Sequence, residues 1–127
     1  MSNYNQPMSD DERNALDAGL QECENRSIAA QAKAAQSYSR LLHLAETRDS
    51  GQVRYIARFL ASTYNGTAFP WNPFELRGLD VDIGDDMLAC LDALRWAKAD
   101  LYRLVPDGER RVEAVIKLWG LQWPESE

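Results

Sequence analysis

The chain lacks a long hydrophobic run, and its first residues lack the pattern of a targeting segment. No stretch approaches the roughly 20 apolar residues that a helix needs to cross a bilayer. The polar start from Met1 to Asp10 has neither the basic beginning nor the apolar stretch of a secretory signal. These absences predict a cytoplasmic protein that has no membrane partner.

Cysteine and histidine are scarce, with two cysteines and one histidine in 127 residues. Cys23 and Cys90 lie far apart and form no C-x-x-C pair, so neither a zinc site nor a redox dithiol is predicted. Because His43 stands alone, every metal motif that needs two histidines is excluded. We therefore expect no bound metal and two reduced, structural thiols.

Motifs of catalysis are also missing. The chain contains no glycine-rich phosphate loop, no G-x-S-x-G and no glycosidase-like pair of carboxylates. One enzyme hypothesis survives, with Cys90 as nucleophile and His43 as its base, because distance along the sequence does not determine distance in space. No local signature surrounds either residue, so we predict a protein that is not an enzyme and has no cofactor.

Positive charge is in the minority, with 14 lysines and arginines against 20 aspartates and glutamates and a net charge of -6. Residues 1–25 and residues 72–92 each carry six acidic side chains and one basic one, whereas residues 26–71 carry six basic and two acidic ones. Nucleic acids and anionic lipids attract clustered cations, so this balance disfavours a nucleic-acid partner. Two acidic zones around a basic one indicate either internal pairing or an acidic face for a basic partner.

What the sequence does contain is helical periodicity from end to end. Apolar residues recur at spacings of three and four, and no stretch alternates with period two for long enough to predict a strand. We predict an all-α fold, a small irregular helical bundle with a long N-terminal helix and one short helix after a loop of proline and aromatic residues. The expected divisions are a disordered leader at 1–8, a helical N-terminal arm at 9–40, a helical core domain at 41–123 and a tail at 124–127.

The expected helices follow from their caps and breakers. Ser9 with Glu12 forms a capping box that starts a helix running to about residue 47, with a break or bend near Gly19 or in the alanine-rich stretch that follows. Asp49 with Gln52 marks the start of the second helix. The remaining helices are predicted at residues 72–78, 80–105 and 108–120, the last of them ended by Gly120 in a left-handed cap.

The densest acidic run, formed by Asp80, Asp82, Asp85 and Asp86, is the first candidate binding site. It fails as a calcium loop, because a loop starting at Asp80 needs glycine sixth and glutamate twelfth, where Asp85 and Leu91 stand. Carboxylates at a helix start also bind free amides and complement the helix dipole. Four carboxylates exceed what one cap needs, so the surplus is predicted to bind basic side chains, either this chain's own Arg54 and Arg58 or those of a partner.

Phe69, Trp71 and Phe74 form the second candidate site, on a rigid connection that also contains Pro70 and Pro73. Aromatic side chains dominate the hot spots of interfaces, but they also pin long loops onto a core. Both roles stay open on the sequence alone. With the acidic run, these three aromatics complete the set of residues predicted to contact a partner.

Several short motifs between residues 41 and 123 are typical of one protein family. They are Asp49-Ser50-Gly51-Gln52, then Arg54, Ala57, Phe59 and Leu60, then Tyr64-Asn65, Phe74, Leu76, Leu79-Asp80, and Asp85-Asp86-Met87. With these motifs the chain resembles a family of small bacterial proteins of unknown function that plasmids, phages and integrative elements often encode. The resemblance implies no activity, cofactor or catalytic residue. It implies a mobile-element setting, in which small acidic proteins often bind host proteins.

Three functional hypotheses follow. The first is a non-enzymatic protein-binding module of a mobile genetic element, with a homodimer through the N-terminal helix as one form of it. A sharper version inhibits a host defence nuclease, because clustered carboxylates can imitate phosphates. The second is a DNA-associated plasmid or phage maintenance protein with Arg40, Arg48, Arg54 and Arg58 as its basic face. The third is the cysteine and histidine enzyme described above.

Overall fold

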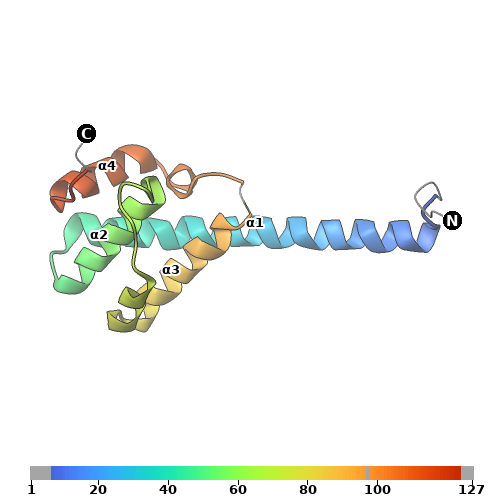
Figure 1. The fold of residues 1–127 in the computed structure, drawn as a ribbon, viewed down its shortest axis with the longest axis horizontal. Helices are drawn as coiled ribbons and strands as arrows, with labels where there is room; N and C mark the ends of the chain where they lie inside the picture. The colour runs from blue at the N-terminus through green and yellow to red at the C-terminus, as the bar shows by residue number, and fades with distance from the viewer. Residues whose placement is uncertain (1–6, 97, 124–127) are drawn as a thin grey trace.

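The computed structural model describes residues 7–96 and 98–123, which fold into four α-helices and two short 3₁₀ helices with no strand among them (Figure 1). In chain order these are α1 (Asp10–Thr47), α2 (Gly51–Tyr64), η1 (Pro73–Gly78), α3 (Val81–Leu94), η2 (Leu101–Leu104) and α4 (Gly108–Leu118). The predicted all-α class, the long N-terminal helix and the short helix after the aromatic loop are confirmed. The predicted leader at 1–8 and tail at 124–127 lie outside the described residues, apart from Pro7 and Met8.

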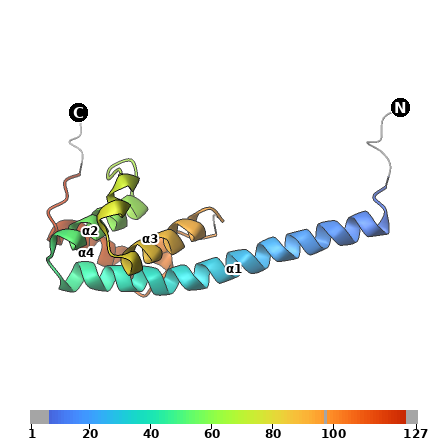
Figure 2. The same cartoon turned by 90° about the horizontal axis from the view of Figure 1, so that it is seen from below.

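Helix α1 is an unbroken helix of 38 residues whose first half projects away from the other helices (Figure 2). The Ser9 hydroxyl accepts a hydrogen bond from the Glu12 amide at 3.1 Å, as expected for its cap. The break predicted near Gly19 or in the alanine-rich stretch is wrong, since residues 10–47 are helical throughout. The other alternative, a bend, is consistent with the curved course of α1 in Figure 2. One glycine costs a helix only about 1 kcal/mol, and the alanines that follow have the highest helix propensity, so nothing here is strong enough to end the helix.

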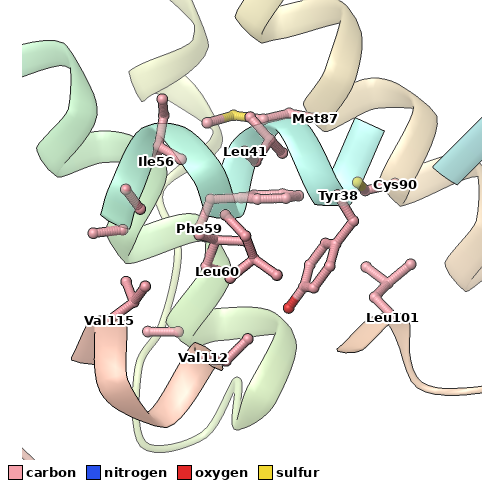
Figure 3. Packing of buried hydrophobic residues seen from close by; sticks show 14 of the residues in the cluster. Tyr38, Leu41, Ile56, Phe59, Leu60, Met87, Cys90, Leu101, Val112 and Val115 are labelled. Atoms are coloured by element: carbon pink, nitrogen blue, oxygen red, sulfur yellow. The ribbon is translucent and has the colours of Figure 1, made fainter. Parts of the chain in front are cut away.

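The hydrophobic core lies where the second half of α1 meets the other helices (Figure 3). Tyr38 and Leu41 of α1 pack with Phe59 of α2 and Met87 of α3, and each is at most 1% exposed. Val112 of α4 closes the cluster from a further side. All four α-helices therefore contribute to a single core, and α1 is the element that runs through it.

Helix α3 lies antiparallel to the second half of α1 and makes the most extensive contact in the molecule (Figure 1). Burial along α1 begins at Ser27 and Ala30, well before residue 41, where the core domain was expected to start. The alanine-rich stretch buries little area per residue, but its small side chains let the α3 backbone approach closely. Residues between 27 and 41 are therefore packed, although their sequence contains few large apolar side chains.

The single helix predicted for residues 80–105 is wrong, because α3 ends at Leu94 and the chain turns before η2. Leu101 is 1% exposed and lies near Tyr38 in the core (Figure 3). An uninterrupted helix would carry Leu101 about 10 Å further along its axis than Leu94, at 1.5 Å per residue. The apolar periodicity exists on both sides of the turn, but burial of Leu101 and Val105 requires the chain to reverse.

A tight turn directs α4 toward the core. Asp107 has a φ of 55°, in the left-handed region that is uncommon for residues other than glycine. The next residue, Gly108, is buried, and a Cβ atom on it would lie 1.7 Å from the carbonyl oxygen of Tyr102. Only a residue without a side chain lets the backbone of η2 pass so close to the start of α4.

Gly108→Ala is expected to lower the free energy of unfolding by about 2–3 kcal/mol, because the added methyl group forces two backbone segments apart. Gly84→Ala is the matched control, since this glycine of α3 has open space around its Cβ position. Alanine there should raise stability by up to about 1 kcal/mol. Urea unfolding followed by circular dichroism measures both changes. Equal midpoints for Gly108→Ala and the wild type would contradict the close approach at this turn.

Candidate functional site

An open groove of about 820 Å³ lies between α1 and α3 and extends to α4. Its charged walls differ in sign, because α1 and α4 contribute basic side chains and α3 contributes carboxylates. The titratable residues that line it are Lys33, Arg40, His43, Arg111, Asp82, Asp85 and Asp86. The structure thus brings three of the four predicted aspartates beside the only histidine. Nothing in the sequence indicated that these aspartates and His43 lie close together, because their proximity depends on how α1 and α3 pair.

Asp86 is bound within the molecule. Its carboxylate accepts hydrogen bonds from Arg40 at 2.6 Å from Nη2 and 3.0 Å from Nε, and Asp86 is only 9% exposed. The bond to Asp86 raises the pKa of Arg40 above its ordinary value. Bidentate pairs of this kind are stronger than single neutral hydrogen bonds. Asp86 therefore ties α3 to α1, which confirms the internal alternative for this residue, but its basic partner is Arg40 rather than the predicted Arg54 or Arg58.

Asp80 is also held inside the chain. Its amide donates to the side-chain oxygen of Gln52, and Gln52 Nε2 donates to the Asp80 carboxylate at 3.3 Å. The prediction that Asp49 and Gln52 cap α2 is wrong, since the N-cap is Ser50 and it makes no side-chain cap bond. Gln52 is engaged by Asp80 instead, where its amide can both donate and accept. Of the four aspartates, Asp82 and Asp85 are the two with exposed, uncommitted positions on α3 among the contacts described.

The aromatic loop is largely fixed on the core. Phe69 is 8% exposed, and its ring centroid lies 4.7 Å from that of Trp123. Trp71 meets Phe59 edge-on at 5.1 Å. Phe74, by contrast, is 66% exposed on η1. Phe69 and Trp71 therefore pin the loop, and Phe74 is the member of the predicted set whose ring faces solvent.

The cysteine and histidine pair is not arranged for catalysis. Cys90 is fully buried, and burial raises the pKa of its thiol to about 12. His43 is exposed and lines the groove, whereas Cys90 does not. The thiolate is the nucleophilic form of cysteine, so a thiol with this pKa is almost entirely unreactive near neutral pH. These surroundings do not favour Cys90 as the nucleophile of the enzyme hypothesis.

The four arginines proposed as a DNA-binding face are not equivalent. Arg40 and Arg58 are committed to ion pairs with Asp86 and Glu75, the second at 3.2 Å. The other two are exposed, Arg48 in the turn between α1 and α2 and Arg54 on α2. The described residues hold no group of three or more histidine, cysteine, aspartate or glutamate side chains placed for a metal ion. Nor does any described helix have the length and apolar character needed to cross a membrane.

The N-terminal half of α1 is a second candidate surface, for which the sequence analysis considered a homodimer contact but named no residues. Residues 10–26 are exposed throughout, and they include Leu16 and Leu20, which are 49% and 60% exposed. Cys23 is exposed on the same helix. These residues follow one another at spacings of four and three, and the same spacing continues into the buried face of α1. This pattern is the feature of the sequence that indicates the surface. Periodicity alone cannot tell which part of a stripe is covered within the chain.

The model of a family described as a family of unknown function, DUF7673, matches residues 35–120, more than half of the chain. The chain belongs to this family. The DUF7673 match covers the last part of α1 and every element from α2 to α4, close to the region of the resemblance found in the sequence motifs. The exposed half of α1 lies outside it. No curated protein and no solved structure matches the chain.

Asp86→Asn is expected to lower the free energy of unfolding by about 1–2 kcal/mol, because it weakens both bonds to Arg40 and removes the charge that balances the guanidinium. Asp85→Asn makes the same chemical change one residue earlier at an exposed position, and it should alter stability by less than about 0.5 kcal/mol. Urea unfolding compares the two variants. Equal losses would contradict the structural role of Asp86.

Cys23 is expected to react rapidly with a thiol reagent in the folded protein, whereas Cys90 reacts only after denaturation, because its buried thiol stays protonated. Release of the reagent's coloured product counts the thiols that react. Cys23→Ser should abolish the rapid reaction, and Cys90→Ser should leave it intact. Similar rates for the two cysteines in the folded chain would revive the enzyme hypothesis.

Proposed function

We propose that the chain is a non-enzymatic protein-binding module that holds its partner on the exposed half of α1, residues 10–26. The observation that supports this function is the projection of Leu16 and Leu20 into solvent from the same helix face that the second half of α1 buries. Apolar side chains gathered on one exposed face are typical of protein interaction sites. A helix that presents such a face is a common docking element.

The projecting helix does not require the partner in order to form. An isolated peptide of this length is only marginally helical in water, because the first turn is costly to nucleate. Here the packed residues 27–47 supply an existing helix, and Ser9 caps the free end. The binding face is therefore preorganised, so less conformational entropy is lost when a partner docks.

The non-enzymatic part of the proposal is supported by the chemistry of the two candidate catalytic residues. Cys90 is buried with a raised pKa, and His43 lies in an open groove among side chains of both charges. Catalytic sites use closely placed groups whose pKa values suit the reaction. These two residues do not provide that arrangement.

Within this proposal, the resemblance to proteins of mobile elements favours a host protein as the partner. Inhibition of a host defence nuclease is the sharper form of this function. Asp82 and Asp85 give α3 an exposed acidic edge, and residues 10–26 carry six acidic side chains and two basic ones. Carboxylates on these surfaces suit a basic groove that otherwise binds nucleic acid.

Affinity capture from the organism that encodes the chain tests the proposal with three baits. They are the wild type, the arm variant Leu16→Gln/Leu20→Gln and the acidic-edge variant Asp82→Asn/Asp85→Asn. Quantitative mass spectrometry should find a protein that the wild type enriches and that the arm variant loses by about tenfold or more. All four changed positions are exposed, and circular dichroism confirms folding.

Recovery of no partner by the wild type would contradict the proposal, and so would equal recovery by the arm variant. Loss with the acidic-edge variant alone would move the binding surface from α1 to the start of α3. The amount of partner recovered with each bait is compared with that of the other two baits. A general loss of folding or of capture is thereby distinguished from the loss of one binding surface.

A further inference from the structure

The exposed half of α1 continues the contact surface that packs on α3. Eight residues of α1 follow one another at alternating spacings of four and three, the repeat of a helix face that pairs with another helix. They are Leu16, Leu20, Cys23, Ser27, Ala30, Ala34, Ser37 and Leu41. From Ser27 onward each is buried, whereas the first three are exposed. Because α1 is unbroken, all eight share one face, which this chain covers only over its second half.

Helix α3 and the turn after it cover this face of α1 as far as Glu24. The Arg26 guanidinium carbon lies 5.6 Å from the centroid of the Trp96 ring, above the ring face. Lys98 Nζ lies 3.3 Å from the Glu24 carboxylate. Residues 10–23 are exposed. The open part of this face therefore lies N-terminal to Glu24, beyond the point where the antiparallel α1–α3 pair ends.

Charged residues flank the open face at regular positions. Asp10, Asp17 and Glu24 are seven residues apart and form one edge of it. Glu12 and Arg26 lie on the other edge, where the Arg26 guanidinium is already placed over the Trp96 ring. Glu24 is the member of the acidic edge that the chain itself covers, and it is bound by a lysine. The ion pair between Lys98 and Glu24 thus shows that a cation is the group that suits this acidic edge. A partner that covers Asp17 and Asp10 must bring cations to the same side.

A second copy of the arm fits this face poorly. In a parallel pair, Glu12 of one helix would face Asp17 of the other, because flanking residues five apart meet across a coiled coil. In an antiparallel pair, the edge formed by Asp10, Asp17 and Glu24 would face its own counterpart. Both arrangements place carboxylates against carboxylates, which is unfavourable. The homodimer considered from the sequence is therefore disfavoured by charge, and a basic partner is favoured.

We propose that the face formed by Leu16, Leu20 and Cys23 binds an amphipathic helix of another protein, one with apolar residues toward this face and lysines or arginines along its flanks. The partner helix lies along α1 beyond the end of α3 and extends the covered face toward the start of α1. This inference rests on the proposed protein-binding function and adds the chemistry of the partner to it.

A matched pair of designed peptides tests this chemistry on the full chain. The probe is a synthetic amphipathic helix with leucines at spacings of four and three and lysines at the flanking positions. Its counterpart carries glutamates at those flanks. Fluorescence anisotropy under reducing conditions measures each Kd. The lysine peptide is expected to bind at least about tenfold more tightly than the glutamate peptide, and its affinity should fall as added salt screens the carboxylates.

Variants of the chain locate the binding. Leu16→Gln/Leu20→Gln is expected to weaken binding of the lysine peptide by about tenfold or more. Leu118→Gln makes the same change at a 65% exposed leucine of α4 and should leave binding unchanged. Asp17→Lys should weaken binding of the lysine peptide and strengthen that of the glutamate peptide, because it reverses the charge of one flank.

Equal affinity for the two peptides would overturn the inference, and so would full binding of the lysine peptide by Leu16→Gln/Leu20→Gln. A wild-type dimer in sedimentation that this double variant dissociates would also overturn it, because the face would then belong to a second copy. A captured partner that docks on the arm through an acidic segment would support the proposed function but contradict the inferred basic chemistry of the partner. Tight binding of the lysine peptide with no captured partner would contradict the proposed function but support the inferred chemistry of the open face.

Discussion

The packing of α3 against the second half of α1 is the contact on which the rest of the structure depends. Small residues such as Ala30 and Ala34 bring the two helices close together, and the partly buried bond between Asp86 and Arg40 links them. The remaining helices assemble on this pair. Helix α4 is attached to α1 by Arg111, which donates to the Glu46 carboxylate at 2.7 and 2.9 Å and holds the pKa of Glu46 below its ordinary value. Without the α1–α3 pair, neither the core nor the groove beside it would exist.

The same pair accounts for the two surfaces left open. The groove lies along the solvent edge of the α1–α3 pair, where charged side chains of both helices line it. The projecting arm forms because α1 is longer than the elements that cover it, and its acidic side chains keep the exposed leucines soluble. Of the two alternatives considered for the acidic residues, internal pairing is confirmed for two of them, whereas an acidic face for a partner stays a prediction. Asp86 and Asp80 pair internally, whereas Asp82 and Asp85 remain available on the surface.

The candidate site could be predicted from the sequence only in part. Sequence reasoning identified the acidic start of α3 and the aromatic loop as unusual, but it could not separate Asp86 from Asp85 or Phe69 from Phe74. Neighbouring residues on a helix face different surroundings, and burial depends on which element packs beside them. For the same reason the arm was predicted as a helix with a homodimer contact as one of its roles, but the sequence did not indicate which part of its apolar stripe the other helices leave uncovered.

The sequence by itself determined the features that depend on residues only a few positions apart. The all-α class, the cap at Ser9 and the left-handed Gly120, with a φ of 64°, all follow from such local interactions. Tertiary structure decided the end of α3 at Leu94, the recruitment of Gln52 by Asp80 and the exposure of half of α1. The physical reason is that periodicity specifies which residues share a face, whereas the free energy of burying that face depends on segments distant in the chain.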